Sequence, residues 1–425
     1  MGPNFLIIAI LVAFVFANEE SFRSLKGAQE ISITCETEKQ LDFVLRFEDN
    51  NHFDFLKVSH VPPENVQVLV TENQLLNFKM QLDQNGIKYK VLVDDFQKVI
   101  DEESKAQRRA LMLANRSHQG DENDTYDFDH FPRHNAINDY MEQMTKKYED
   151  VTLFSIGYSY DGRSINGVKI SSGGNKTKPA ILIDGGIHAR EWISPVTALH
   201  TISELVNEKN KELYKNVDWY IIPVLNPDGY EFTHGKDRLW RKNRSKIGHR
   251  QCRGVDLNRN FGYKWKLSGR SRHPCHITYA GKAPFSELES QHLRDFFLSK
   301  NGTIKIYLTL HSFGKYLLYP WGYTPAEVPE NEDVLLKLGV IAAVKLKALY
   351  GTEYKIGSAA RILYPAAGGS DDWAKAIGKA DIAFTIELPG TSFVIDPSLI
   401  KPIGLETFEA FRVFGVYAEI VYKDL

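Results

Sequence analysis

Short apolar runs alternate with longer amphipathic stretches from about residue 120 to the end of the chain. Three of these runs have the length and composition of buried strands: AILID at 180–184, IKIYLTL at 304–310 and IAFTI at 382–386. Strands that alternate with segments of helical length are typical of helices packed on a largely parallel sheet. The pattern therefore predicts one large α/β domain in this part of the chain.

The N-terminal part has a different pattern. Residues 18 to about 95 combine strand-like runs, such as VQVLV at 66–70, with an amphipathic stretch from Glu72 to Asn85, which predicts a small α+β unit. Next, residues 94–128 begin with helical periodicity and decay into charged and small polar residues.

Basic residues on such a connector are accessible to a trypsin-like protease. We therefore expect units at 18–109 and 117–425, separated by an activation cleavage near one of three residues: Arg108, Arg109 or Arg116. An ordinary linker with incidental arginines is the alternative.

The first residues have the pattern of a targeting signal. Residues 5–16 are almost entirely apolar, and Val15-Phe16-Ala17 has the small-residue spacing of a signal-peptidase site. A membrane anchor is the alternative, but a helix needs about 20 apolar residues to span a bilayer. We therefore expect residues 1–17 to be removed, and we expect a secreted protein without a membrane anchor.

Charge and cysteine content fit a secreted globular protein. The 52 basic and 54 acidic side chains nearly cancel, so nothing indicates a nucleic-acid partner. Secretion permits a disulfide between Cys252 and Cys275, which leaves Cys35 unpaired. Five glycosylation sequons also suit a secretory route, although a sequon alone is weak evidence; they begin at Asn115, Asn123, Asn175, Asn243 and Asn301.

Metal-binding residue types follow the three strand-like runs. His188 and Glu191 form an HxxE pair after the first run, His311 follows the second, and Glu387 follows the third. In open α/β sheets, ligands bind just beyond the carboxyl ends of the strands. Catalytic zinc takes three protein ligands and leaves one position open. An HxxE pair alone is more often part of a solvated helix face, so the zinc prediction depends on all three strand ends.

Seven blocks follow one another along the chain: GGIHAREWISP, NPDGY, RLWRKNRS, GVDLNRNF, LHSFG, ILYPAAGGSDDW and TIEL. Together these blocks resemble the zinc metallocarboxypeptidases of the pancreatic A/B type. The resemblance covers about residues 120–425, and residues 18–108 are similar to that family's inhibitory activation domain. It implies a mixed, largely parallel twisted sheet with helices on both faces, preceded by the α+β activation domain. It also implies a monomeric zymogen with one zinc ion per chain that acts on peptide or protein C-termini.

The same resemblance assigns roles around the metal. It implies His188, Glu191 and His311 as zinc ligands, with Asp256 accepting a hydrogen bond that orients His188. Glu387 would be the general base that takes a proton from zinc-bound water and returns one to the leaving amine. Without the resemblance, a solvated glutamate at a strand end is the simpler interpretation of Glu387.

Further roles concern the substrate. Arg241 would stabilise the oxyanion, while Asn258 and Arg259 would bind the terminal carboxylate, for which a guanidinium offers paired hydrogen bonds. Tyr364 would close over the bound residue, and Arg190 would contact the peptide further along. Each has a structural alternative: a basic surface run for Arg241, packing for Tyr364, and a structural salt bridge for Arg190.

Substrate preference depends on the residue after GGS in the last long block, here Asp371. A buried aspartate requires a cation, so the resemblance implies a B-type preference for C-terminal Arg or Lys. Alternatively, Asp371 and Asp372 cap the helix that starts near Trp373.

Two departures bear on the pocket and its surroundings: Gly322 and Ala359 add no polar group, and LPG follows Glu387 where pancreatic relatives carry LRD. An A-type enzyme for apolar termini and an inactive peptide-binding relative are the competing hypotheses.

Overall fold

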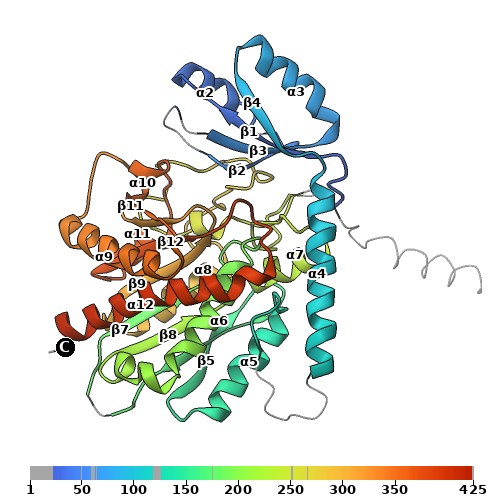
Figure 1. The fold of residues 1–425 in the computed structure, drawn as a ribbon. Helices are drawn as coiled ribbons and strands as arrows, with labels where there is room; N and C mark the ends of the chain where they lie inside the picture. The colour runs from blue at the N-terminus through green and yellow to red at the C-terminus, as the bar shows by residue number, and fades with distance from the viewer. Residues whose placement is uncertain are drawn as a thin grey trace, which may run out of the picture.

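The structure is a computed structural model that describes residues 23–423, apart from residues 49, 59–62, 64, 118–125, 175, 250–251 and 266. Figure 1 shows a small N-terminal unit above a larger one, with the long helix α4 (Phe96–Ser117) running down the side of the larger unit. The predicted signal segment 1–17 lies outside the described residues.

The small unit is an antiparallel sheet with two helices on it, as the apolar pattern predicts. The strand order is β2-β3-β1-β4. Alternate strand residues such as Ile31, Ile33, Val66 and Val68 point into one core with Phe78 of the second helix. Its elements are β1 (Gln29–Thr34), α2 (Glu38–Leu45), β2 (Phe53–Lys57), β3 (Asn65–Val70), α3 (Glu72–Gln84) and β4 (Lys88–Val93).

Helix α4 is longer than the sequence pattern suggests. It continues through Arg108 and Arg109 and ends at Ser117, although the composition becomes polar in this part. The segment RRALMLANR is rich in arginine, alanine, leucine and methionine, which are strong helix formers and sustain the helix. The expected connector is therefore largely helical up to Ser117.

The large unit is built on an eight-stranded mixed sheet with the order β11-β10-β12-β9-β7-β8-β6-β5. The central neighbours β12, β9, β7 and β8 are parallel, while β6 and β5 at one side, and β10 against β12, are antiparallel. The strands are β5 (Val151–Tyr158), β6 (Ser164–Ile170), β7 (Ala180–Asp184), β8 (Asp218–Ile222), β9 (Ile304–Ser312), β10 (Tyr316–Tyr319), β11 (Lys355–Ser358) and β12 (Ile382–Leu388).

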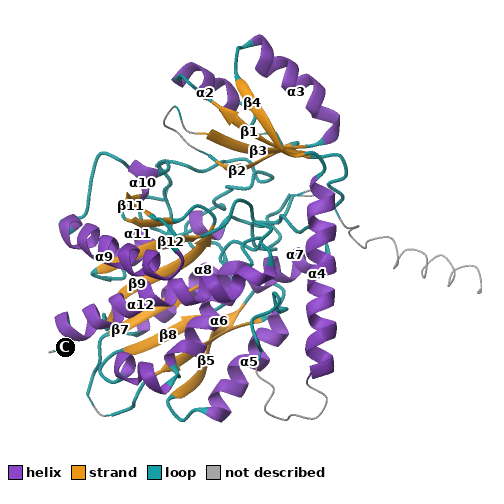
Figure 2. Ribbon diagram, in the orientation of Figure 1, coloured by secondary structure: helices purple, strands orange, loops and turns teal. Residues whose placement is uncertain are grey.

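Helices cover both faces of this sheet (Figure 2). Helices α5, α6, α9 and α12 pack on one face, and α8 and α11 pack on the other. Among the described helices, none is both long and apolar enough to cross a membrane. The helices are α5 (His134–Lys147), α6 (Ile193–Leu205), α7 (Pro227–Gly235), α8 (Leu288–Ser299), α9 (Glu332–Tyr350), α10 (Ala359–Ile362), α11 (Ser370–Ala376) and α12 (Ile400–Val421).

Strand register brings polar side chains together at one end of the sheet. His311 of β9 lies opposite Glu387 of β12, and Thr309 lies opposite both Thr385 of β12 and Asp184 of β7. Because side chains two residues apart share a face of a strand, these five residues project from the same face. The apolar residues between them, such as Leu310 and Ile386, belong to the core on the opposite face.

Candidate functional site

Three predicted metal ligands converge in the folded chain. His188 and Glu191 lie in the turn after β7, and His311 lies near the end of β9. The Nδ1 atom of His188 is 2.9 Å from Glu191 Oε1 and 3.0 Å from His311 Nδ1, and His311 Nδ1 is 3.1 Å from Glu191 Oε2. All three side chains are buried.

This geometry fits a zinc ion. His188 Nε2 lies 3.1 Å from Asp256 Oδ1, so Nε2 carries the proton and the Nδ1 lone pair faces the other two ligands. The facing electron pairs repel one another unless a cation lies among them. In a tetrahedral site with ligand distances near 2.0 Å, neighbouring donor atoms are about 3.3 Å apart, close to the spacing seen here.

Charges around the ligands keep the carboxylates ionised. Burial alone would raise the pKa of Glu191, but His188 and His311 outweigh it and hold this pKa well below its usual value. Asp256 is also buried, yet Arg241 and His188 hold its pKa well below the ordinary range. Both carboxylates are therefore available as anions, one toward the metal and one toward His188.

Glu387 and Arg241 flank the ligand cluster. Glu387 lies in β12 beside His311, and burial raises the pKa of Glu387 to about 7. Arg241 donates two hydrogen bonds of 3.1 Å to Asp256 Oδ2, and its Nη1 lies 4.0 Å from Glu191 Oε1. A carboxylate that can gain or lose a proton near neutral pH and a fixed guanidinium thus line the same cavity.

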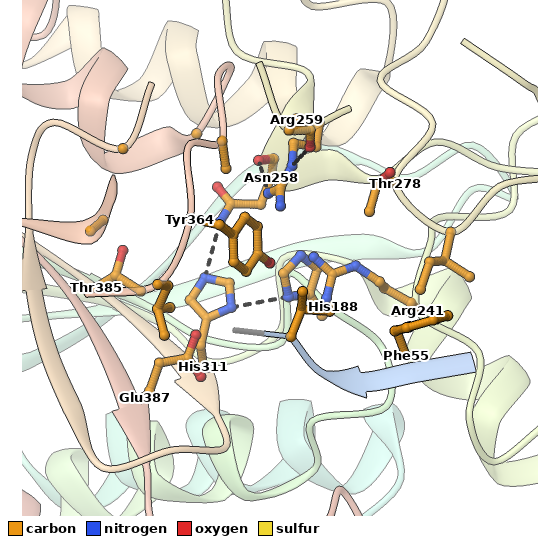
Figure 3. Close-up of a pocket in the computed structure, with 18 of the residues that line it drawn as sticks. Phe55, His188, Arg241, Asn258, Arg259, Thr278, His311, Tyr364, Thr385 and Glu387 are labelled. Atoms are coloured by element: carbon orange, nitrogen blue, oxygen red, sulfur yellow. Dashed lines mark hydrogen bonds between the residues drawn. The ribbon is translucent and has the colours of Figure 1, made fainter. Parts of the chain in front are cut away.

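Figure 3 shows Asn258, Arg259 and Tyr364 near the two histidines. Asn258 and Arg259 belong to the short 3₁₀ turn Leu257–Arg259, and the side chain of Asp256 accepts from the Asn258 N–H. The Arg259 guanidinium bonds two carbonyls, those of Gly269 and Asn258. Asn258, Arg259 and Tyr364 line a cavity of about 580 Å³ together with the metal ligands.

Asp371 lines the same cavity and is buried. Its carboxylate accepts one hydrogen bond of 3.0 Å, from the Thr385 hydroxyl, and no cationic side chain in the described part of the chain forms an ion pair with it. The side chain does not cap α11, whose N-cap Gly369 has no capping side-chain bond. Asp372 instead accepts from the backbone N–H groups of Gly322 and Tyr323.

Arg190 has a partner that sequence reasoning did not identify. Its Nη1 lies 3.0 and 2.8 Å from the two carboxylate oxygens of Asp54 in strand β2 of the small unit, and both residues are buried. Phe393 packs against the guanidinium at 4.0 Å. The available signal was an aspartate between two phenylalanines in a short, mostly apolar strand.

A second buried ion pair joins α4 to the large unit. Arg238 binds both carboxylate oxygens of Glu103, at 2.6 and 2.9 Å. Four residues later, the Gln107 side chain both accepts from the Phe131 N–H and donates to the Phe131 carbonyl. The helix that carries the candidate cleavage residues is therefore anchored before the first of them.

The cysteines are arranged as the sequence predicts. Cys252 and Cys275 form a disulfide with Cα atoms 4.9 Å apart, and it closes the loop beside the cavity. Cys35 is free and buried in the core of the small unit.

Comparisons with known proteins identify two family models in the chain. Residues 137–410 match the family model described as zinc carboxypeptidase, and residues 31–103 match the carboxypeptidase activation peptide. Carboxypeptidase B of Astacus astacus is 41% identical over 304 residues, which cover 70% of this chain and all of that protein. Carboxypeptidase A2 of Rattus norvegicus is 34% identical over 95% of both chains.

Solved structures give the same result. The crystal structure of carboxypeptidase A from Helicoverpa armigera superposes with a TM-score of 0.87 at 30% identity, covering 94% of this chain and 99% of that one. The fold, the activation peptide and the buried His188, Glu191 and His311 cluster are thus found together in one chain. The chain belongs to the zinc carboxypeptidase family, as a zymogen of the A/B type with zinc as its cofactor.

Proposed function

We propose that the activated enzyme removes C-terminal arginine or lysine from peptides and proteins. The observation that carries this preference is the buried carboxylate of Asp371, which lines the cavity and has the Thr385 hydroxyl as its one hydrogen-bond partner among the described residues. Burying a charge without a counterion is unfavourable in free energy. A substrate cation beside Asp371 compensates for this desolvation free energy. Gly322 and Ala359 line the same cavity and leave room for a long side chain.

The chemistry of the site follows from its charges. His188, Glu191 and His311 hold the metal; when bound, zinc supplies a Lewis acid that polarises the scissile carbonyl and acidifies water. Glu387 takes a proton from the attacking water and returns a proton to the departing amine, for which a pKa near 7 is suitable. Arg241, held in place by Asp256, places positive charge where the oxyanion develops.

Exopeptidase action requires recognition of a free C-terminus. Arg259 is buried and bonds only carbonyl oxygens among its described partners, so its remaining N–H groups are available for a substrate carboxylate. Asn258 precedes it and lines the same cavity. An internal peptide segment gains none of this binding energy. In this proposal Tyr364 covers the bound terminal residue as a hydrogen-bonding phenol.

The small unit keeps the enzyme latent in this proposal. Residues 55–58 of the small unit line the cavity, and Figure 3 shows Phe55 close to Arg241. Asp54 forms an ion pair with Arg190, the arginine to which we assign contacts with the peptide upstream of the cleaved bond. This ion pair leaves Arg190 unavailable to the peptide. A peptide substrate must displace both groups, so the uncut chain should have little activity.

Activation requires a cut in or after α4, and we place it at Arg116. Proteases bind several residues in an extended conformation, so a helix must unwind locally before cleavage. Arg108 and Arg109 lie in the helix interior, directly after the anchored Gln107. Arg116 lies in the last turn, where unwinding breaks fewer bonds.

Limited trypsin digestion tests this assignment. Arg116→Gln should remain uncut and inactive under conditions that activate the wild type, whereas the Arg108→Gln/Arg109→Gln double variant should activate normally. The N-terminal sequence of the product, expected to start at Ser117, identifies the cut. Normal activation of Arg116→Gln would show that the helix interior is the true site.

Secretion is part of the same proposal, supported by the signal-like residues 1–17 and by the disulfide. Two of the five sequons differ in whether their asparagine is exposed. Asn243 is buried, and its amide donates to Glu287 and Glu289, so it is not a glycan acceptor. Asn301 is exposed in the turn after α8 and can accept a glycan. Asn123 and Asn175 lie outside the described residues.

One assay tests the proposed function. Trypsin-treated secreted protein should hydrolyse matched synthetic peptides that end in Arg or Lys, should act poorly on those ending in Leu or Phe, and should lose activity when a zinc chelator is added. The untreated protein serves as the control for latency. Preferential release of Leu or Phe favours an A-type enzyme, and absence of any release favours an inactive peptide-binding relative.

A further inference from the structure

The face of the sheet that carries His311 also carries a buried pair with no role in the proposed function. Asp184, the last residue of β7, lies opposite Thr309 of β9 in the parallel register. His311 follows Thr309 by two residues and therefore projects from the same face. The exposed fractions are 0% for Asp184, 0% for Thr309 and 1% for His311, so water does not solvate these groups.

Their polar atoms form a continuous chain. The Thr309 hydroxyl donates to Asp184 Oδ1 at 2.9 Å, and its oxygen lies 3.3 Å from His311 Nε2. The other ring nitrogen of His311, Nδ1, faces Glu191 and His188. One nitrogen of the imidazole thus points to the ligand cluster, and the other points to the threonine.

The proton on His311 can be placed from these contacts. When Nδ1 binds a metal it has no proton, so Nε2 carries one and needs an acceptor. The nearby Asn258 Nδ2, at 3.4 Å, is itself a donor, because the Asn258 oxygen already accepts from the Ser370 N–H. The Thr309 oxygen remains as the acceptor, and its own hydrogen goes to Asp184.

We propose that Asp184 and Thr309 are positioning residues for His311, which they hold in the tautomer and orientation that bind zinc. Asp256 orients His188 through a direct hydrogen bond to its Nε2. Asp184 would orient His311 in the same way but indirectly, because the Thr309 hydroxyl lies between the carboxylate and the imidazole. This inference rests on the proposed ligand role of His311. Loss of such outer partners typically weakens metal affinity by about 10- to 100-fold.

Zinc affinity, measured by competition with a chromogenic chelator on the purified full-length chain, tests the proposal. Thr309→Val keeps the shape and β-branching but removes the acceptor, and it should weaken zinc binding by about tenfold or more. Thr309→Ser keeps the hydroxyl and should bind zinc nearly as the wild type does. Thr385→Val is the matched control, because Thr385 lies opposite Thr309 but donates to Asp371; its zinc affinity should be unchanged.

The outcomes separate this inference from the proposed function. A wild-type chain that binds no zinc contradicts the proposed function itself. Wild-type affinity in Thr309→Val contradicts only the role of Thr309. Asp184→Asn gives a second measurement that does not depend on the folding of the valine variant; it should weaken zinc binding severalfold, and unchanged affinity would exclude a role for the Asp184 charge.

Discussion

Glu387→Gln is expected to reduce kcat for a C-terminal arginine peptide by about a thousandfold, within the range of roughly 10²–10⁴ found for general acid–base residues. The amide has nearly the same shape as the carboxylate but cannot accept the proton of the attacking water. Burial raises the pKa of Glu387 to about 7, so the native carboxylate can also return that proton to the amine. Steady-state kinetics on trypsin-activated protein measure the loss.

Two controls distinguish a chemical defect from a folding defect. Glu387→Gln should retain zinc and should still bind a C-terminal arginine peptide, because Asp371 and Arg259 are unchanged. Glu406→Gln replaces another buried glutamate, one that accepts from Thr352 on the far side of the core, and it should leave kcat unchanged. A Glu387→Gln enzyme with near-normal kcat would remove Glu387 from the mechanism.

Asp371→Ile is expected to change the substrate preference from C-terminal Arg or Lys to C-terminal Leu or Phe. An unpaired charge in a buried site costs about 3–5 kcal/mol, which corresponds to a factor of roughly a hundred to several thousand at about 1.4 kcal/mol per tenfold. The kcat/KM for peptides ending in Arg or Lys should fall by that order, while peptides ending in Leu or Phe should become better substrates. Parallel kinetics on the four peptides give the ratio.

A near-isosteric variant separates charge from shape at this position. Asp371→Asn removes the charge but keeps a polar side chain in the cavity, so activity on arginine peptides should fall without a gain on leucine peptides. Because Thr385 donates to Asp371 Oδ2, the asparagine oxygen can accept the same hydrogen bond. If both variants still prefer arginine, another residue sets the specificity and Asp371 has a structural role.

The metal site was largely predictable from sequence because strand ends are strong signals. The apolar runs at 180–184, 304–310 and 382–386 lie within β7, β9 and β12, and the register of β9 and β12 places Glu387 beside His311. Local patterns determine where a strand ends, and the parallel arrangement of the sheet then brings distant ends together.

Contacts between units were not predictable. The Asp54–Arg190 and Glu103–Arg238 pairs join residues 136 and 135 positions apart, and no local pattern selects those partners. The polar composition after Gln107 does not indicate the length of α4, because helix propensity sustains the helix as far as Ser117. The pairing of Asp184 with Thr309 requires the strand register, which an apolar run such as AILID does not specify.

The anchoring of α4 affects what a single cut achieves. Glu103 and Gln107 both precede Arg108, Arg109 and Arg116, so cleavage at any of these arginines leaves every contact described between α4 and the large unit on the severed fragment. The cut converts a tethered inhibitor, present at a high effective concentration, into a separate ligand whose occupancy depends on its bulk concentration. The onset of activity should therefore depend on dilution. At high protein concentration the cleaved small unit stays bound and the enzyme remains largely inhibited. On dilution the small unit dissociates and the enzyme becomes active.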